Sequence, residues 1–344
     1  KRGDVPMCGI PYHAAKNYIK RLLEEGKKIA VCEQVEMPTD ARTLAKREVV
    51  QIITPATVVD DDYLDALSSS YLFCFYTEGN TRLSLAITDI SSGEFLLEDR
   101  EGPDFLLHLR SLLAQYRPKE ILVDEDDYFG NQEIAGVVDV ARAMVTKLPH
   151  SFFSGPDGYS LMCGHLGIAS LKSFGINQTY PALGPGGAVL RYLMDTARST
   201  LSQISTYRIV SSGHVLHMDE ATRRNLEIVT NIQDGSTHFT LFDAVNYTKT
   251  AGGTRLLKTW LVTPITDELE LKRRQDWIEL LLTDSAERQR VRGALSTVLD
   301  MVRLTSRVAM ARAIPHDLVS IRQTLQTFFA LISQDFERYH VLLD

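Results

Sequence analysis

Apolar and polar residues near the N-terminus follow two different spacings. Apolar side chains recur every three to four positions through residues 13–25, which is the period of an amphipathic helix, and Gly26 is a typical stop for it. Short apolar runs over residues 28–34 and 47–55 then predict two strands. A helix joined to two short strands indicates a small α/β unit, so we expect a first domain at residues 1–55.

A polar, acidic stretch over residues 55–70 separates this unit from a second pattern. Three apolar runs with short polar turns between them predict an antiparallel meander, at residues 71–77, 81–90 and 93–99. A helical pattern over residues 103–116 and a strand over 119–125 indicate that this second unit is again α/β. The sequence GPGG, residues 184–187, is a typical break, so we place the second domain at residues 56–187.

Almost every segment beyond this point has the helical period, so we expect residues 188–344 to form a helical bundle or a long-helix domain. Pro315 stands in the first turn of the last predicted helix, where proline is favoured. Two apolar stripes support the prediction: Met301, Leu304, Val308 and Ala311 form one, and Leu318, Ile321, Leu325, Phe328 and Ile332 form the other.

One further helix is predicted over residues 218–232, with Asp219 as its cap. Asn225 lies in the middle of the apolar stripe of this helix. A buried side-chain amide must find hydrogen-bond partners. We therefore interpret Asn225 as a structural polar clamp to another helix or loop, with a ligand contact as the alternative.

The formal charge of −7 is unevenly distributed along the chain. Residues 1–54 hold ten Lys and Arg against seven Asp and Glu, residues 55–190 hold eight against nineteen, and residues 191–344 hold nineteen against eighteen. A polyanion is therefore least expected to bind the middle segment. Four scattered cysteines and the lack of a long apolar run predict a cytoplasmic protein with no membrane partner.

Reactive side chains are concentrated in the sequence MCGIPYH, residues 7–13. A catalytic pair of Cys8 and His13 is one interpretation, but catalytic Cys and His residues are usually far apart in sequence. We favour a structural turn with Cys8 as a small buried residue. The glycine-rich sequences GPGG and AGGTR do not fit a phosphate-binding loop. We therefore expect no catalytic residue in this chain.

Two acidic residues suggest a different function. Asp89 lies on the second strand of the meander and Asp124 at the end of the strand that follows the helix. This order is typical of a ribonuclease-H-like fold, in which carboxylates from such strands form a two-metal site. A metal-dependent nuclease centred on Asp89 is thus an alternative function. Such a site needs about four converging carboxylates, and only these two can be named, so we expect no metal site.

Several stretches together resemble one known family. They are MCGIPYHAAKNYIKRLLEEGKKIAVCEQ, REVVQIITPATV, ITDISSGEF, MDEATRRNLEI and GGTRLLKTWLVTPI, and they occur in the order found in that family. The chain resembles MutS, the bacterial DNA mismatch-recognition family, over nearly its whole length. The combination of GIPYH…CEQ with ATRRNLEI is highly specific for it.

The resemblance implies an internal segment with a multidomain fold, α/β followed by all-α. It would contain the end of the mismatch-binding domain, a connector domain with a ribonuclease-H-like fold but no nuclease activity, and the first part of a helical lever or core domain. Lys1, Arg2 and Met7 match family positions close to the DNA, and the position of Cys8 is not a nucleophile there. Gly252 and Gly253 depart from the family pattern and predict a looser helix entry.

The resemblance also implies partners. Mismatched double-stranded DNA, a second copy of the full-length protein and the repair protein MutL, contacted through the connector domain, are expected. ATP and Mg²⁺ would bind an ATPase domain outside this segment, so we expect the segment itself to hold no cofactor and to be no enzyme. The family's Phe-x-Glu pair, which wedges beside the mismatch, stands upstream of this stretch. A MutS paralogue that binds branched DNA is a further alternative.

Overall fold

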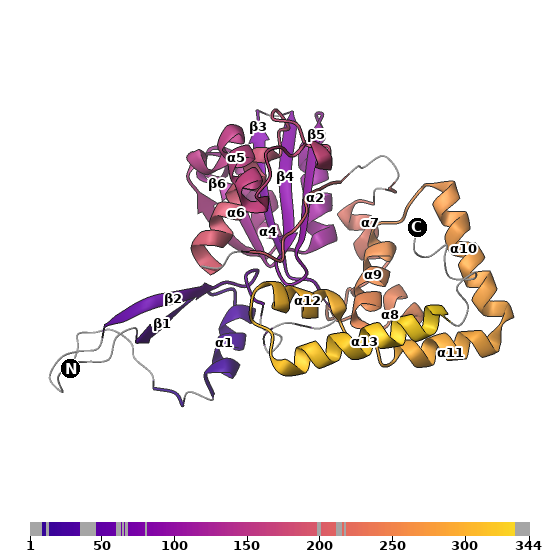
Figure 1. The fold of residues 1–344 in the computed structure, drawn as a ribbon. Coiled ribbons are helices and arrows are strands. Elements are labelled where there is room, and N and C mark those ends of the chain that lie inside the picture. Colours follow the sequence, from indigo (N-terminus) through magenta and orange to yellow (C-terminus); the bar gives the residue numbers. More distant parts are fainter. Residues whose placement is uncertain are drawn as a thin grey trace.

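The computed structural model describes residues 9–11, 14–34, 46–59, 63, 65, 68–79, 81–197, 201–210, 215–216 and 218–333. These residues form three parts: a helix with a two-stranded hairpin, a six-stranded sheet with helices on both faces, and a group of helices beside the sheet (Figure 1). The predicted class, α/β units followed by helices, is confirmed at this level.

The N-terminal unit has the predicted elements. Helix α1 spans Ala15–Glu24, and strands β1 (Ile29–Gln34) and β2 (Arg47–Ile53) pair antiparallel. A small cluster holds them together, in which Leu23, Ile53 and Val58 are the buried members among the described residues. The described residues of this unit therefore form little apolar core of their own.

The sheet has the strand order β7-β6-β3-β4-β5-β8. The predicted meander is confirmed as the antiparallel strands β3 (Tyr71–Glu78), β4 (Arg82–Asp89) and β5 (Glu94–Glu101). Three parallel pairings extend it through β6 (Glu120–Asp124), β7 (Met144–Leu148) and β8 (Arg208–Ile209). The strands alternate side chains between the two faces, so that Phe73 and Phe75 of β3 enter one core and Leu72 and Cys74 the other.

Helices cover both faces of this sheet (Figure 1). Helices α2 (Phe105–Tyr116) and α4 (Gln132–Val140) pack on the face of Phe73, while α5 (Gly155–Leu166) and α6 (Leu183–Ala197) pack on the opposite face. The short helix α3 (Glu125–Gly130) follows β6 directly, and two 3-10 turns span His150–Phe153 and Lys172–Phe174.

The GPGG sequence does not break the chain as expected, because it forms the start of α6. A Cβ atom at Gly184 would lie 2.3 Å from the carbonyl oxygen of Phe153, and one at Gly187 would lie 2.5 Å from the Cα of Gly158. These glycines therefore allow α6 to approach α5 and the turn before it closely. The predicted domain limit at residue 187 falls inside this helix.

The remaining helices lie beside the sheet (Figure 1). They are α7 (Glu220–Asn225), α8 (Leu241–Val245), α9 (Ala251–Val262), α10 (Glu268–Thr283), α11 (Ser285–Leu295), α12 (Met301–Ala309) and α13 (Pro315–Ser333). Asp219 caps α7 by accepting a hydrogen bond from the Thr222 N–H at 2.6 Å, as predicted. The helix then ends at Asn225, far short of residue 232, and Asn225 is exposed. The expected buried polar clamp is therefore wrong, because the apolar spacing continues past the point where the helix stops.

The second apolar stripe does not face a core within the described residues. Leu318 is 57% exposed and Leu325 is 42% exposed, whereas the buried face of α13 consists of Asp317, Ser320 and Thr324. Asp317 accepts two hydrogen bonds from the Arg307 guanidinium, at 2.6 and 3.2 Å, which satisfies this polar face. The helix is correct, but the side that it buries here is not the apolar one.

Candidate functional site: a polar junction between the sheet and the helices

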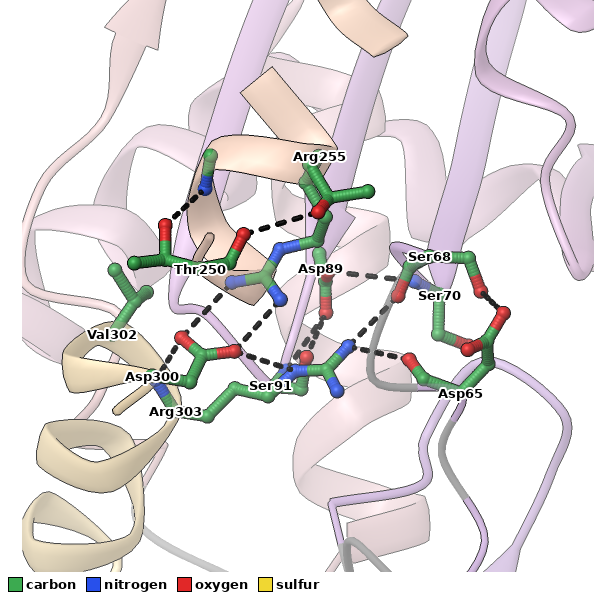
Figure 2. Close-up of polar contacts among 12 residues, drawn as sticks. Asp65, Ser68, Ser70, Asp89, Ser91, Thr250, Arg255, Asp300, Val302 and Arg303 are labelled. Atoms are coloured by element: carbon green, nitrogen blue, oxygen red, sulfur yellow. Dashed lines mark hydrogen bonds and ion pairs between the residues drawn. The ribbon is translucent and has the colours of Figure 1, made fainter. Parts of the chain in front are cut away.

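A group of charged side chains joins the helical part to the sheet (Figure 2). Its centre is Arg255 on α9, whose guanidinium forms a bidentate pair with Asp300, at 2.7 Å from Nη1 to Oδ2 and 3.0 Å from Nη2 to Oδ1. Local sequence places both residues. Thr250 caps α9 by accepting from the Gly253 N–H at 3.0 Å, and Asp300 caps α12 by accepting from the Arg303 N–H at 3.4 Å.

Arg303 extends the group from α12 toward the stretch before the sheet. Its side chain is buried, and Nη2 donates to the carbonyl oxygens of Asp65 at 3.1 Å and Ser68 at 2.8 Å. Nε also lies 3.8 Å from Asp300. A single guanidinium therefore links residues more than 230 positions apart, which holds the segment before β3 against the helices.

The same segment is fixed on its other side by Asp89, at the end of β4 (Figure 2). The Asp89 carboxylate is 2% exposed and accepts from the Ser70 N–H at 3.3 Å, the Ser91 N–H at 2.9 Å and the Ser91 hydroxyl at 2.7 Å. The Ser70 hydroxyl donates to the Pro55 carbonyl at 2.9 Å. A polar path thus runs from the helices through Asp65, Ser68 and Ser70 to the sheet.

The charges along this path balance one another. Burial lowers the pKa of Arg255, but its hydrogen bond to Asp300 and the negative charges of Asp300 and Asp89 raise it overall. Burial raises the pKa of Asp300, but the hydrogen bond and charge of Arg255, with help from Arg303, bring it below its usual value. The arrangement is suited to holding two structural units together rather than to proton transfer, because each carboxylate already accepts several hydrogen bonds.

A second contact joins the helical part to α2. Arg223 on α7 donates to the Ser111 carbonyl at 2.8 Å, and the Ser111 hydroxyl donates to the Met218 carbonyl at 3.0 Å. Arg117, at the end of α2, donates to the Thr230 hydroxyl at 2.8 Å. The helical part is thus joined to α2 by these hydrogen bonds, in addition to the polar junction.

The described residues of the stretch over 55–70 are mostly shielded from solvent. Residues 55–59 and Ser70 are buried, Tyr63, Ser68 and Ser69 are half-buried, and Asp65 is exposed. Its described part is therefore an ordered connection with specific hydrogen bonds and not a solvated spacer.

Asp89 and Asp124 do not converge on one site. Asp89 is paired with Tyr71 at the beginning of β3, whereas Asp124 follows Val123, which is paired with Phe75 near the end of β3. Five strand positions separate the two levels, or about 16 Å along the strand direction. The two carboxylates named for the alternative nuclease therefore lie toward opposite ends of the strands, on either side of β3.

One group in the described part of the chain has metal-ligating side chains close together, namely Asp124, Asp126 and His150, with possible ligand atoms within 4.8 Å of one another. Asp124 Oδ2 lies 2.6 Å from His150 Nδ1, and Asp124 Oδ1 accepts from the Asp126 N–H at 2.9 Å as the cap of α3. The hydrogen bond between His150 and Asp124, together with the negative charge of Asp124, raises the pKa of His150. Capping and the ion pair explain the positions of these residues without a metal.

The predicted DNA-contacting residues Lys1, Arg2 and Met7 lie outside the described residues, as do Cys8 and His13. Among the residues of the junction, Asp89 was named from the sequence as a candidate metal ligand, whereas Arg255, Asp300 and Arg303 were not predicted as a site. Arg255 stands in the sequence GGTRLLKTWLVTPI, and Asp300 with Arg303 shows the spacing of a helix cap and its first turn. These signals locate the residues on helices, but the pairing of α9 with α12 could not be found from them.

Three family models match the chain: MutS domain I over residues 1–62, MutS domain II over residues 70–205 and MutS domain III over residues 221–341. A DNA mismatch repair protein MutS from Treponema denticola is 37% identical over 337 residues, which cover 95% of this chain and 38% of that protein.

Other relatives show the same relation. The DNA mismatch repair protein MutS of Symbiobacterium thermophilum is 34% identical over 94% of this chain and 37% of its own length, and that of Borrelia turicatae is 32% identical over 96% and 38%. The chain thus spans less than two fifths of the length of these relatives. Among the described residues, no helix is both long and apolar enough to span a bilayer.

Proposed function

The chain belongs to the MutS family of DNA mismatch repair proteins, and from this premise we propose that its three parts transmit DNA binding at the N-terminal unit to an ATPase domain outside this segment. The observation that carries the proposal is the polar path from Arg255 and Arg303 through Asp65, Ser68 and Ser70 to Asp89. Transmission between distant sites needs rigid elements whose relative arrangement both sites can bias, and this path connects two such elements.

The sheet part is proposed to be a ribonuclease-H-like connector. The three-stranded antiparallel meander β3-β4-β5, flanked on the β3 side by the parallel strands β6 and β7, supports this assignment. We propose that the connector has no nuclease activity, because Asp89 already accepts three hydrogen bonds from Ser70 and Ser91, and Asp124 lies toward the opposite end of the strands. ATP and Mg²⁺ would act in the full-length protein only.

The full-length protein is proposed to act in the cytoplasm as a homodimer that binds mismatched duplex DNA and recruits MutL through the connector. The acidic character of residues 55–190, with nineteen Asp and Glu against eight Lys and Arg, favours a protein partner over DNA for the connector surface.

DNA binding by the isolated chain provides the first test. We expect the 344-residue chain to bind duplex DNA weakly, with Kd on the order of 10⁻⁴ M at physiological salt, through a few phosphate contacts of the N-terminal unit. It should bind mismatched and matched duplexes equally, because reading a mismatch in this way needs an apolar wedge in the minor groove. Fluorescence anisotropy with labelled duplexes at two salt concentrations measures both. A preference of about tenfold for the mismatch, equal to 1.4 kcal/mol, would show that this segment reads the mismatch itself.

Hydrolysis provides the second test. The chain is incubated with ATP or with DNA in Mg²⁺ or Mn²⁺, and we expect no turnover. Cleavage of DNA that disappears in Asp89→Asn would instead establish a metal-dependent nuclease.

A further inference from the structure

A buried carboxylate connects the N-terminal unit to the sheet. Glu120, the first residue of β6, has a fully buried side chain. Three hydroxyl groups donate to it: Thr54 to Oε2 at 2.5 Å, Tyr192 to Oε1 at 2.5 Å and Thr146 to Oε1 at 2.9 Å. The positive charge of Lys28 is also close, with Nζ at 3.9 Å from Oε1.

The partners of Glu120 come from both sides of the boundary. Thr146 on β7 and Tyr192 on α6 belong to the sheet part, whereas Thr54 directly follows β2 and Lys28 directly precedes β1. Lys28 Nζ also lies 5.1 Å from the centre of the Tyr192 ring, a cation–π distance. Glu120 is thus the point at which both ends of the N-terminal hairpin meet the sheet.

The three hydroxyl groups favour the ionised form of this carboxylate. An ionised carboxylate can accept from all three at once, and each such hydrogen bond stabilises its charge. Burial raises the pKa of Glu120, and the three hydroxyl groups and Lys28 oppose this rise without cancelling it. Thr54 is itself held by Thr57, whose hydroxyl lies 3.0 Å from that of Thr54 and accepts from the Thr54 N–H at 2.9 Å.

Apolar contacts also join the N-terminal unit to the sheet, because Ala56 and Val59, which follow β2, belong to a core of the sheet. The described residues of the unit bury a small apolar cluster of their own, and units with little core depend on neighbours for their stability. A cleft of about 1190 Å³ lies between α1 and the loops at this sheet edge, lined by Lys20 and Leu23 on one side and by Lys119 and Arg142 on the other. The connection is therefore concentrated at Glu120 and the buried residues that follow β2.

We propose that Glu120, Thr54, Tyr192 and Lys28 form a latch that fixes the N-terminal hairpin on the connector sheet and so positions the DNA-binding unit. The positioning of a DNA-binding unit rests on the proposed function, whereas the latch itself does not. Glu120 acts as a positioning residue, because its partners are protein groups. Releasing it should allow the hairpin to move while the sheet stays folded.

The latch is tested by hydrogen–deuterium exchange on the full 344-residue chain. Thr54→Val removes the hydroxyl that donates to Glu120 at nearly constant volume, and Thr54→Ser retains it. We expect amides of residues 50–59 to exchange about tenfold faster in Thr54→Val, the factor that corresponds to the loss of one hydrogen bond to a charged group. Thr54→Ser should restore slow exchange, and amides of β4 and β5 should stay protected in both variants.

Charge is tested separately with Glu120→Gln and Lys28→Met. Lys28→Met keeps the apolar stem over Tyr192, and Lys27→Met is the matched control, because Lys27 is adjacent but is not a partner of Glu120. Faster exchange at residues 50–59 is expected in Glu120→Gln and Lys28→Met but not in Lys27→Met, and the double variant should add little to Glu120→Gln.

Two results would overturn the latch. Unchanged exchange at residues 50–59 in both Thr54→Val and Glu120→Gln would show that the hairpin is held elsewhere. Equal loss of protection in β4 and β5 would show that Glu120 only supports the core of the sheet. Fluorescence anisotropy with a DNA duplex tests the proposed function separately. If the parent chain does not bind DNA but the variants show the local change in exchange, the latch is supported and the DNA-binding role is refuted.

Discussion

The pair of Arg255 and Asp300 should contribute strongly to the stability of the helical part. The side chains are 13% and 18% exposed, and the contact is bidentate. Removal of one partner from a buried ion pair costs about 3–5 kcal/mol, because the other charge remains buried. In Arg255→Met, Asp300 keeps the Arg303 N–H at 3.4 Å and the Arg303 guanidinium at 3.8 Å. We therefore expect a smaller loss, of about 2–3 kcal/mol in the free energy of unfolding.

Urea unfolding followed by tryptophan fluorescence measures this loss. Both tryptophans of the chain, Trp260 and Trp277, lie on helices α9 and α10, so the signal reports on the helical part. With a denaturant dependence of about 2–3 kcal/mol/M, the midpoint should fall by about 1 M. Arg273→Met is the control, because it breaks an exposed pair with Glu270 that should add nothing measurable.

The pH dependence gives an independent check on the same pair. The pKa of Asp300 is below its usual value in the folded protein. Its contribution should therefore be fully present above about pH 4, the usual pKa of an unfolded Asp, and disappear as the pH falls through the folded pKa. The difference between the parent and Arg255→Met should shrink over that range. If Arg255→Met unfolds at the same urea concentration as Arg273→Met at neutral pH, the junction does not stabilise the helices and the reasoning fails.

Two smaller predictions concern other contacts. The pKa of the His150 imidazole, measured by NMR, should lie above the usual 6.5, and Asp124→Asn should lower it. The raised pKa stabilises the fold below about pH 6.5, and this gain is lost as the pH rises through the folded pKa. An unshifted titration of His150 would contradict the ion pair. Gly252→Ala should stabilise α9 by about 0.5–1 kcal/mol, because the added Cβ meets open space. Gly253→Ala should gain less or lose stability, because its Cβ would lie 2.9 Å from the Thr250 hydroxyl that caps the helix. Thermal unfolding that ranks the two variants in the opposite order would contradict the capping geometry.

Local patterns predicted most elements of the chain. The spacing and length of the apolar runs correctly placed α1, both hairpin strands, the meander, α2 and β6, because these signals follow the local backbone period of a helix or strand. Asp219 and Pro315 marked helix starts as expected, since a cap or an N-terminal proline acts within one turn. The resemblance to MutS also followed from short sequences alone.

Contacts between distant segments could not be predicted in this way. A periodic stripe indicates that a face can be buried but not what covers it, and α13 in fact buries Asp317, Ser320 and Thr324. The glycines of GPGG indicate a break when read locally, but their role is to let α6 approach α5. The apolar spacing around Asn225 continues to residue 232, but the helix ends at Asn225.

The sequence by itself determined the type and order of the elements and the family, because these depend on local backbone preference and on short specific sequences. Only the tertiary structure decided which charges meet. Arg303 donates to the carbonyl oxygens of Asp65 and Ser68, and Glu120 accepts from the hydroxyl groups of Thr54, Thr146 and Tyr192. A buried charge is tolerated only where its partners surround it. Those partners are supplied by elements far apart in the chain, so their meeting is a property of the packed layers and not of any one segment.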